Sequence, residues 1–277
     1  MVHISSLVSF FSPRAGEVSG AEASAKDSKV SVKEKPSADY IPNPVNVPRN
    51  KMYSLEEASD EGAYELMFAT KAGLPLPHFP ISHSAIALRD PTQDRFAIYG
   101  RQSPYNFTMW FDKGFSIRTK KDNEMPYLNK GFNFTAYPTG VFFSKEEMEH
   151  CLDEADRLIN ENQSCNMVNS NCYSYSVMVM ALAIQQLLKR PTVDSAAVSR
   201  IIAVMEGHPL SDHCAFGVFN NQEVVDKLVS VNSQIQSHLE TIENKSDEDN
   251  HLLQQSLALS EKIEKEAPKY RIFASFT

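Results

Sequence analysis

Apolar residues in the second half of the chain recur three or four positions apart, which is the spacing of amphipathic helices. Ser144 and Glu147 form a capping box, and the apolar pattern behind them predicts a helix that runs to residue 162. A strongly apolar run predicts a second helix over residues 172–190, and residues 196–206 predict a shorter third helix. The pattern therefore indicates that this half of the protein is mainly helical.

The apolar pattern narrows to a single seam from residue 222 onward. A polar stretch over residues 244–250 divides the seam, so we expect two antiparallel helices that form a C-terminal hairpin. Such seams most often pack against the protein's own core, which is the favoured interpretation; the alternative is a partner-docking arm over residues 222–266. The seam residues are Val224, Leu228, Val231, Ile235, Leu239 and Ile242, followed by Leu252, Leu253, Leu257, Leu259 and Ile263.

The first half of the chain combines one predicted helix with predicted strands. Ser54 and Glu57 form another capping box, which predicts a helix over residues 55–71. Residues 83–89 and 96–100 predict two strands, and the polar, proline-containing segment between them indicates a hairpin turn. Together with the later helices, these elements predict an α+β fold.

Three segments complete the predicted organisation. Residues 1–50 contain a stretch rich in Ser, Ala, Lys, Glu and Pro, which predicts a disordered leader because it offers little apolar surface to bury. Short aromatic runs over residues 105–143 predict irregular strands and loops, and residues 214–219 could form a strand. We therefore expect a catalytic domain over residues 51–220, followed by the hairpin and tail over residues 221–277.

Composition narrows the class of protein. The 277 residues suffice for one sizeable core with extensions, and the net charge of −8 without a basic stripe argues against a nucleic-acid binder. No apolar stretch reaches the roughly 18 residues of a membrane span. The four cysteines form no CxxC pair, which argues against a disulfide framework and favours a reducing compartment. No nucleotide, cofactor or metal-binding motif occurs, so we expect neither cofactor nor metal.

The candidate chemistry centres on Cys172 and His83. Cys172 stands at the predicted start of a helix, where unpaired N–H groups and the helix dipole favour a thiolate. His83 opens a predicted strand and is the candidate general base for that thiol. Taken alone, Cys172 would be interpreted as a buried structural cysteine and His83 as a strand-end histidine; the pairing is what favours nucleophilic catalysis.

The NCYSYS string at residues 171–176 resembles the cysteine motif of circularly permuted papain-like hydrolases. That group includes the PPPDE desumoylating isopeptidases, the lecithin retinol acyltransferase family and permuted NlpC-type enzymes. The resemblance covers residues 80–190, including the Tyr-Gly pair that ends the second strand. It implies an antiparallel sheet packed on a central cysteine-bearing helix, with Cys172 as nucleophile and His83 as base.

The third catalytic group and the identity of the base stay open at this stage. The resemblance places an orienting residue on the strand after that of the histidine, where Tyr99 is favoured over Gln102. Arg95 stands where retinol-type acyltransferases carry a second histidine, and a guanidinium cannot accept the imidazole N–H, which weakens the acyltransferase interpretation. His213 precedes another apolar run and is the alternative base, in the unpermuted order of cysteine before histidine.

The expected function is therefore a thiol hydrolase that cleaves an amide, isopeptide or thioester bond. The resemblance implies a protein substrate, such as a ubiquitin-like tail or a host protein. Two alternatives stay open: an acyltransferase or transglutaminase-like transferase that uses the same pair, and a non-catalytic interaction protein that uses the hairpin. The polar leader, the acidic balance and a Glu-rich tail resemble bacterial effectors exported by type IV secretion, so we expect a cytoplasmic protein or one delivered into a host cell.

Overall fold

A computed structural model describes most of the chain from residue 43 onward. The described residues are 43–71, 75–76, 79–80, 83–102, 112–113, 115–117, 134–160, 164–165, 171–211 and 215–274. Residues 36–277 form one compact unit, to which all of these belong. The leader expected over residues 1–50 lies outside the described residues as far as residue 42.

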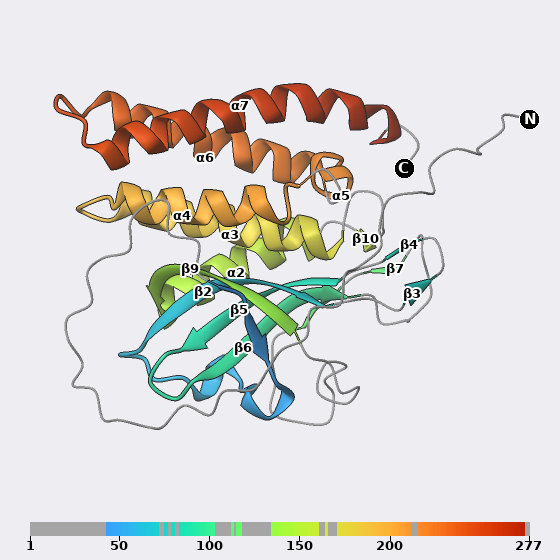
Figure 1. Ribbon diagram of the computed structural model, residues 1–277. Helices are drawn as coiled ribbons and strands as arrows, with labels where there is room; N and C mark the ends of the chain where they lie inside the picture. The colour runs from blue at the N-terminus through green and yellow to red at the C-terminus, as the bar shows by residue number, and fades with distance from the viewer. Residues whose placement is uncertain are drawn as a thin grey trace, which may run out of the picture. The chain divides into compact units, whose positions relative to one another are not determined.

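The centre of the structure is a six-stranded antiparallel sheet with the strand order β1-β9-β2-β5-β6-β8 (Figure 1). The strands are β1 Val45–Val47, β2 Ala63–Lys71, β5 His83–Asp90, β6 Arg95–Gln102, β8 Phe115–Ile117 and β9 Phe134–Ser144. Two small two-stranded pairs accompany it, β3 Pro75–Leu76 with β4 Phe79–Pro80, and β7 Asp112–Lys113 with β10 Ser164–Cys165. Short helical turns occur at η1 Arg49–Lys51, η2 Leu55–Glu57 and η3 Asp156–Asn160.

Helices cover one face of this sheet in two layers (Figure 1). The inner helices pack directly on the strands, α3 on β5 and α4 on β9. The outer layer consists of α6, which packs on α3, and α7, which packs on both α4 and α6. The helices are α2 Lys145–Ala155, α3 Cys172–Lys189, α4 Ser195–Gly207, α5 Ala215–Phe219, α6 Gln222–Glu240 and α7 Asp247–Ala274.

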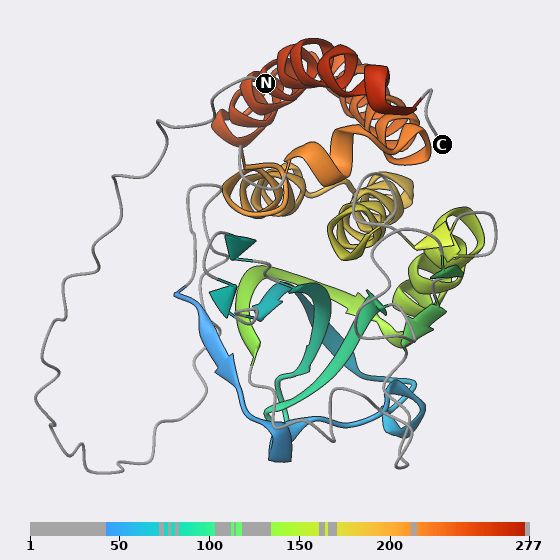
Figure 2. The same cartoon turned by 90° about the vertical axis from the view of Figure 1, so that its right-hand side faces the viewer.

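Strand alternation divides the buried side chains of the sheet into two clusters. The larger cluster lies between the sheet and the helices and takes the large residues of β5, Ile86 and Leu88, together with most of α3. The smaller cluster lies on the other face and takes the alternate residues, such as Ala85 and Ala87 on β5 and Phe134 on β9. Figure 2 shows that the strands curl strongly. Successive residues of β5 therefore point to opposite faces of the sheet, and only every second side chain meets the helices.

The prediction of a helix over residues 55–71 is wrong. Ser54 caps only the single turn η2, and residues 63–71 form β2, which pairs with both β5 and β9. Six consecutive residues of β2, from Tyr64 to Ala69, are buried because both faces of this central strand are covered. A strand buried on both faces lacks the period-two signal, so its apolar run was open to a helical interpretation.

Three other expectations need correction. Val45–Val47, within the segment predicted to be disordered, pairs with β9 as an edge strand. Phe134–Ser144, expected to be irregular, is the longest strand of the sheet; a register shift against β2 and the positive φ of Gly140 (66°) bend it. Ala215–Phe219, expected to be a strand, is the short helix α5.

The capping box at Ser144 is confirmed, although α2 ends at Ala155 and a short helical turn continues it to Asn160. Ser144 accepts a hydrogen bond from Glu147 N at 3.1 Å while the Glu147 carboxylate accepts from Ser144 N at 2.8 Å, so the predicted capping box opens α2. The predicted strands are present as β5 and β6, and the predicted helices over residues 172–190 and 196–206 are present as α3 and α4. Among the described helices, none combines the length and the apolar character needed to cross a bilayer.

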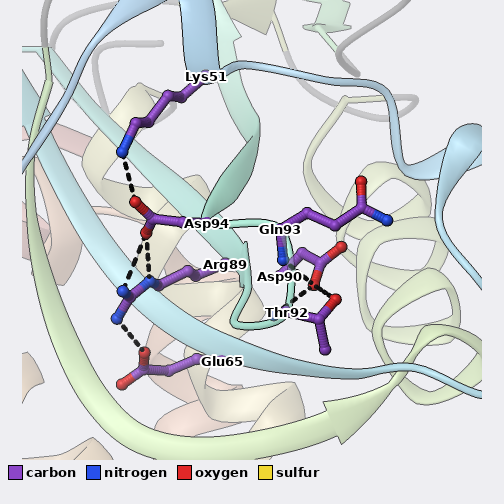
Figure 3. A network of polar contacts seen from close by, with 7 residues as sticks. All are labelled: Lys51, Glu65, Arg89, Asp90, Thr92, Gln93 and Asp94. Carbon is purple, nitrogen blue, oxygen red and sulfur yellow. Dashed lines mark hydrogen bonds and ion pairs between the residues drawn. The ribbon is translucent and has the colours of Figure 1, made fainter. Parts of the chain in front are cut away.

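A polar network fixes the turn between β5 and β6 (Figure 3). Asp94, which adopts a left-handed conformation with φ of 47°, accepts hydrogen bonds from Arg89 at 2.9 and 3.2 Å and from Lys51. Arg89 also lies 3.6 Å from the carboxylate of Glu65 on β2. The network ties the hairpin turn to the neighbouring strand, at the opposite end of β5 from His83.

Candidate functional site

Cys172 is the first residue of α3, and the residue before it caps the helix. The Asn171 side chain accepts hydrogen bonds from Tyr173 N at 2.9 Å and from Ser174 N at 3.2 Å. In return, Ser174 Oγ accepts a hydrogen bond from Asn171 N at 2.9 Å, which completes a capping box. This cap fixes the backbone on both sides of Cys172 and holds its sulfur at the positive end of the helix dipole.

A second element holds the cap in place. Asn171 Nδ2 donates a hydrogen bond to the carbonyl oxygen of Gly217 on α5 at 3.4 Å. Gly217 has no side chain, and a Cβ atom at this position would lie 2.4 Å from Asn171 Nδ2. The glycine therefore allows α5 to approach the start of α3 closely.

The sulfur of Cys172 faces the first inward-pointing residue of β5. Ser84 N lies 3.5 Å from Cys172 Sγ and donates toward it. Ser84 is fully buried, and its hydroxyl oxygen lies 3.4 Å from Ser176 Oγ, one turn further along α3. Ser176 Oγ donates to the carbonyl oxygen of Cys172 at 2.9 Å. Ser84 on β5 thus contacts the partly buried thiol, and Ser176 on α3 links the Ser84 hydroxyl to the backbone of Cys172.

Burial and hydrogen bonding shift the pKa of the Cys172 thiol in opposite directions. Burial is the largest and raises the pKa of Cys172, while the Ser84 N–H, the Ser84 hydroxyl and the N–H groups of Cys172 and Tyr173 lower it. The net direction is upward, so Cys172 needs a base to ionise at neutral pH. Cys151, inside α2, differs: it is fully buried, and burial raises the pKa of its thiol to about 12.

The structure does not bring His83 to Cys172. The Ser84 side chain faces α3, where its hydroxyl lies 3.4 Å from Ser176 Oγ, so His83, one residue earlier on the same strand, projects from the opposite face of the sheet. Its ring packs against Phe134 of the smaller cluster, with the ring centroids 6.4 Å apart. Burial, with repulsion from Lys71 on the neighbouring strand, lowers the pKa of His83 to about 4. The imidazole is therefore neutral at neutral pH and belongs to the face remote from the thiol.

This placement predicts a pH-dependent stability. The pKa of His83 is depressed in the folded state, so the favourable contribution of the neutral imidazole is complete above the unfolded value near 6.5 and is lost as the pH falls toward about 4. Between pH 7 and pH 4.5, the wild-type protein should lose about 1–2 kcal/mol more unfolding free energy than His83→Gln, a range reduced for partial exposure of the side chain. Urea unfolding at both pH values measures this difference. Equal losses in the two proteins would contradict the placement of His83.

The expected orienting residue lies on the other side of the sheet from His83. Tyr99 pairs with Ile86 and belongs to the cluster that faces the helices, so it shares a face with Cys172 and cannot orient the His83 ring. Gln102 ends β6, and its side chain lies outside the described residues. Arg95 begins β6, at the far end from His83, with its guanidinium 4.5 Å from the ring of Tyr53.

The alternative base, His213, lies outside the described residues, which stop at Ser211 and resume at Ala215. One described imidazole does lie on the same face as Cys172. His208, the C-cap of α4, stacks on Tyr137 of β9 with the ring centroids 3.7 Å apart. Its centroid lies 5.9 Å from that of Phe68, which in turn lies 6.5 Å from the ring of Tyr173.

The His208 ring stands above β9, whereas the Cys172 sulfur meets β5, two strands away. Two strands correspond to about 10 Å across the sheet, which is beyond hydrogen-bond reach. His208 therefore borders the site without contacting the thiol. Sequence reasoning did not assign it to the site, because only the return of α4 to the start of α3 brings it there.

Sequence reasoning also missed Ser84. A signal was present, since β5 alternates small Ala85 and Ala87 with large Ile86 and Leu88, and the large residues face the helix layer. Extending that alternation backward places Ser84, and not His83, on the face that meets the helices. Because of the register of β5 against α3, the hydroxyl of Ser84 lies beside the sulfur, where the imidazole of His83 was expected.

Comparisons with known proteins give no relative: no family model, no curated protein and no solved structure matches this chain. The chemistry of the site must therefore be argued from its own residues. Within the described ranges, no group of three or more His, Cys, Asp or Glu side chains is arranged to hold a metal ion. The arrangement offers a thiol at a helix start, N–H and hydroxyl donors around the sulfur, and aromatic side chains on the adjoining strands.

Proposed function

We propose that the protein is a thiol hydrolase in which Cys172 attacks the carbonyl carbon of an amide, isopeptide or thioester. The observation that carries the proposal is the set of donors around the sulfur: the Ser84 N–H at 3.5 Å, the Ser84 hydroxyl and the first N–H groups of α3. Donors in this arrangement stabilise a thiolate. The N–H of Cys172 itself is also suited to bind the oxyanion that develops on the substrate.

The reaction follows from these groups. A base removes the Cys172 proton, and the thiolate forms a carbon–sulfur bond to the carbonyl carbon. Collapse of the tetrahedral adduct breaks the bond to the leaving amine or thiol, and the base donates to this leaving group the proton that it removed from Cys172. Water then attacks the thioester, which releases the carboxylic acid and restores the thiol. Replacing this water by an acceptor amine would give the transferase variant of the same chemistry.

For the base, the proposal favours His213 over His83. Gly217 follows His213 by four residues, and its carbonyl oxygen contacts Asn171, the neighbour of Cys172. A chain of four residues spans at most about 14 Å, and this short separation in the sequence is the ground for proposing His213 as the base. His83, in contrast, packs against Phe134 on the far face of the sheet. In the proposal the sheet and helix resemble a papain-like core, with the histidine supplied after the cysteine and not from the permuted position.

The base can be identified by the rate at which Cys172 reacts with iodoacetamide at pH 7, read by peptide-mapping mass spectrometry. His213→Ala is expected to slow labelling of Cys172 by at least about tenfold, because the thiol then ionises without assistance. His83→Ala serves as the matched control and should leave the rate within about twofold. A rate that falls only in His83→Ala would overturn the assignment. A wild-type Cys172 that reacts no faster than Cys151 would remove the support for a reactive thiol.

A non-catalytic interaction protein is the second candidate. The displacement of His83 to the other face and the raised pKa of Cys172 favour it. In that case α6 and α7 would form a hairpin that binds a protein partner over residues 222–266. Most of the apolar seam on α6 already packs inside the protein, however. Val224, Leu228 and Ile235 are buried in the same core as the sheet and the inner helices. This burial favours the packing interpretation of the hairpin.

The substrate in the proposal is a protein or peptide, such as a ubiquitin-like tail or a host protein. Delivery into a host cell, suggested by the likeness of the termini to secreted effectors, stays a proposal. A panel of peptide, isopeptide and lipid esters, tested with Cys172→Ala as the blank, would separate hydrolysis of protein substrates from acyl transfer to lipids.

A further inference from the structure

We propose that Ser84 is a positioning residue for the Cys172 nucleophile: its backbone N–H and its hydroxyl together stabilise the thiolate that forms at the start of α3 when the base removes the proton. The inference rests on the proposed function, because it assigns the residue that prepares the same thiol for attack. It names a role for a strand residue that neither the motif at residues 171–176 nor the histidine pattern indicated.

The geometry gives Ser84 two separate donors. The backbone N–H already points at Cys172 Sγ, with the nitrogen at 3.5 Å. This N–H comes from the first residues of β5, and the strand is held on one side by pairing between Ser84 and Thr70 of β2. The backbone donor is therefore fixed by the sheet and does not depend on the rotamer of any side chain.

The hydroxyl of Ser84 provides a donor that can respond to charge. Ser176 Oγ has a single proton, which it gives to the Cys172 carbonyl oxygen at 2.9 Å. The Ser84 hydroxyl can then donate its proton either to Ser176 Oγ, at 3.4 Å, or to the sulfur. A thiolate is a stronger acceptor than a neutral hydroxyl, so ionisation of Cys172 draws the Ser84 proton toward the sulfur.

Burial strengthens the contact between the Ser84 hydroxyl and the Cys172 sulfur. Ser84 and Ser176 are both fully buried, and water cannot replace a missing donor at this side of the sulfur. Hydrogen bonds to charged groups are stronger in such a setting than between neutral partners. Loss of the Ser84 hydroxyl should therefore make ionisation of the thiol harder, whereas loss of the Ser176 hydroxyl should not, because Ser176 bonds the carbonyl oxygen and not the sulfur.

The test compares two variants that differ only in the hydroxyl. Ser84→Thr keeps the hydroxyl, and Ser84→Val has the same shape without it. The pH dependence of Cys172 alkylation by iodoacetamide, read by peptide mapping in the full chain, gives the pKa of the thiol in each protein. We expect Ser84→Val and Ser84→Ala to raise that pKa by about one pH unit, and Ser84→Thr and Ser176→Ala to leave it near the wild-type value.

Identical pH profiles for the Thr and Val variants would overturn the role of the hydroxyl, as would an equal change in Ser176→Ala. Ser84→Ala removes a single oxygen, so a folded protein is expected, and urea unfolding confirms it before alkylation. The two proposals fail separately. A protein that forms no acyl-enzyme with any substrate still has a measurable thiol pKa, and an acyl-enzyme with an unchanged profile in Ser84→Val would defeat only the assignment of Ser84.

Discussion

Cys172→Ala protein is expected to form no covalent adduct with an acylating substrate, and to lose hydrolysis by a factor on the order of 10⁴ or more. The reason is that no other described thiol has comparable surroundings. Cys172 is partly exposed and lies among donors, whereas Cys151 is fully buried and burial raises its pKa to about 12. Intact-protein mass spectrometry after mixing with a thioester or an activated ester detects the adduct directly.

Cys151→Ala is the matched control for this experiment. It removes a thiol from α2 without touching the start of α3, so both the adduct and the turnover should persist. Adduct formation that survives in Cys172→Ala would show that another residue is the nucleophile. Loss of the adduct in both variants would point to damage to the fold and would be recognised by their unfolding curves.

Phe68→Ala is expected to lower the free energy of unfolding by about 3–5 kcal/mol, the largest effect on stability that we anticipate near the site. Phe68 is fully buried on the central strand β2. Its ring contacts those of Tyr137, Tyr173 and His208, with centroid separations of 6.4, 6.5 and 5.9 Å. Truncation would leave a cavity beneath all three rings, since the sheet cannot collapse around a single missing side chain.

Urea unfolding of the wild-type and variant proteins measures this effect. Phe142→Ala on β9 is a suitable control, because the Phe142 side chain is 43% exposed and its removal should cost less than about 1 kcal/mol. A loss in Phe68→Ala no greater than that in Phe142→Ala would be inconsistent with a well-packed aromatic cluster beside Cys172. A large loss of stability with unchanged Cys172 labelling would separate the structural role of the cluster from the chemistry of the thiol.

The helices of the second half could be predicted because their signals are local. The Ser144–Glu147 capping box and the apolar spacing along α3 act within a few residues, and both are present in the structure. The same kind of signal failed over residues 55–71. Ser54 does cap a turn, but the apolar residues behind it form a strand because β5 and β9 pair with both of its edges. Pairing partners that are distant in the chain overrode the local propensity.

From the sequence, the half of the site on α3 was placed correctly and the half on β5 was misassigned. Cys172 at a helix start follows from the Asn171 cap and the apolar run, both of which can be seen in the sequence. Which β5 side chain would face it could not be decided from either residue alone, because His83 and Ser84 differ by one position and hence by one face of the sheet. The position of His208 was equally inaccessible, because it depends on the antiparallel return of α4.

By itself, the sequence determined the mixed α+β class, the start of the cysteine-bearing helix and the apolar faces of the later helices. These features depend on hydrogen bonds and side-chain periodicity over a single turn or a few turns of chain. Only the tertiary structure decided that residues 63–71 form the central strand, that Ser84 meets the Cys172 sulfur, and that His83 packs against Phe134 on the opposite face. Such outcomes depend on strand pairing and on the register of a helix against a sheet, which are set by the packing of segments far apart in the chain.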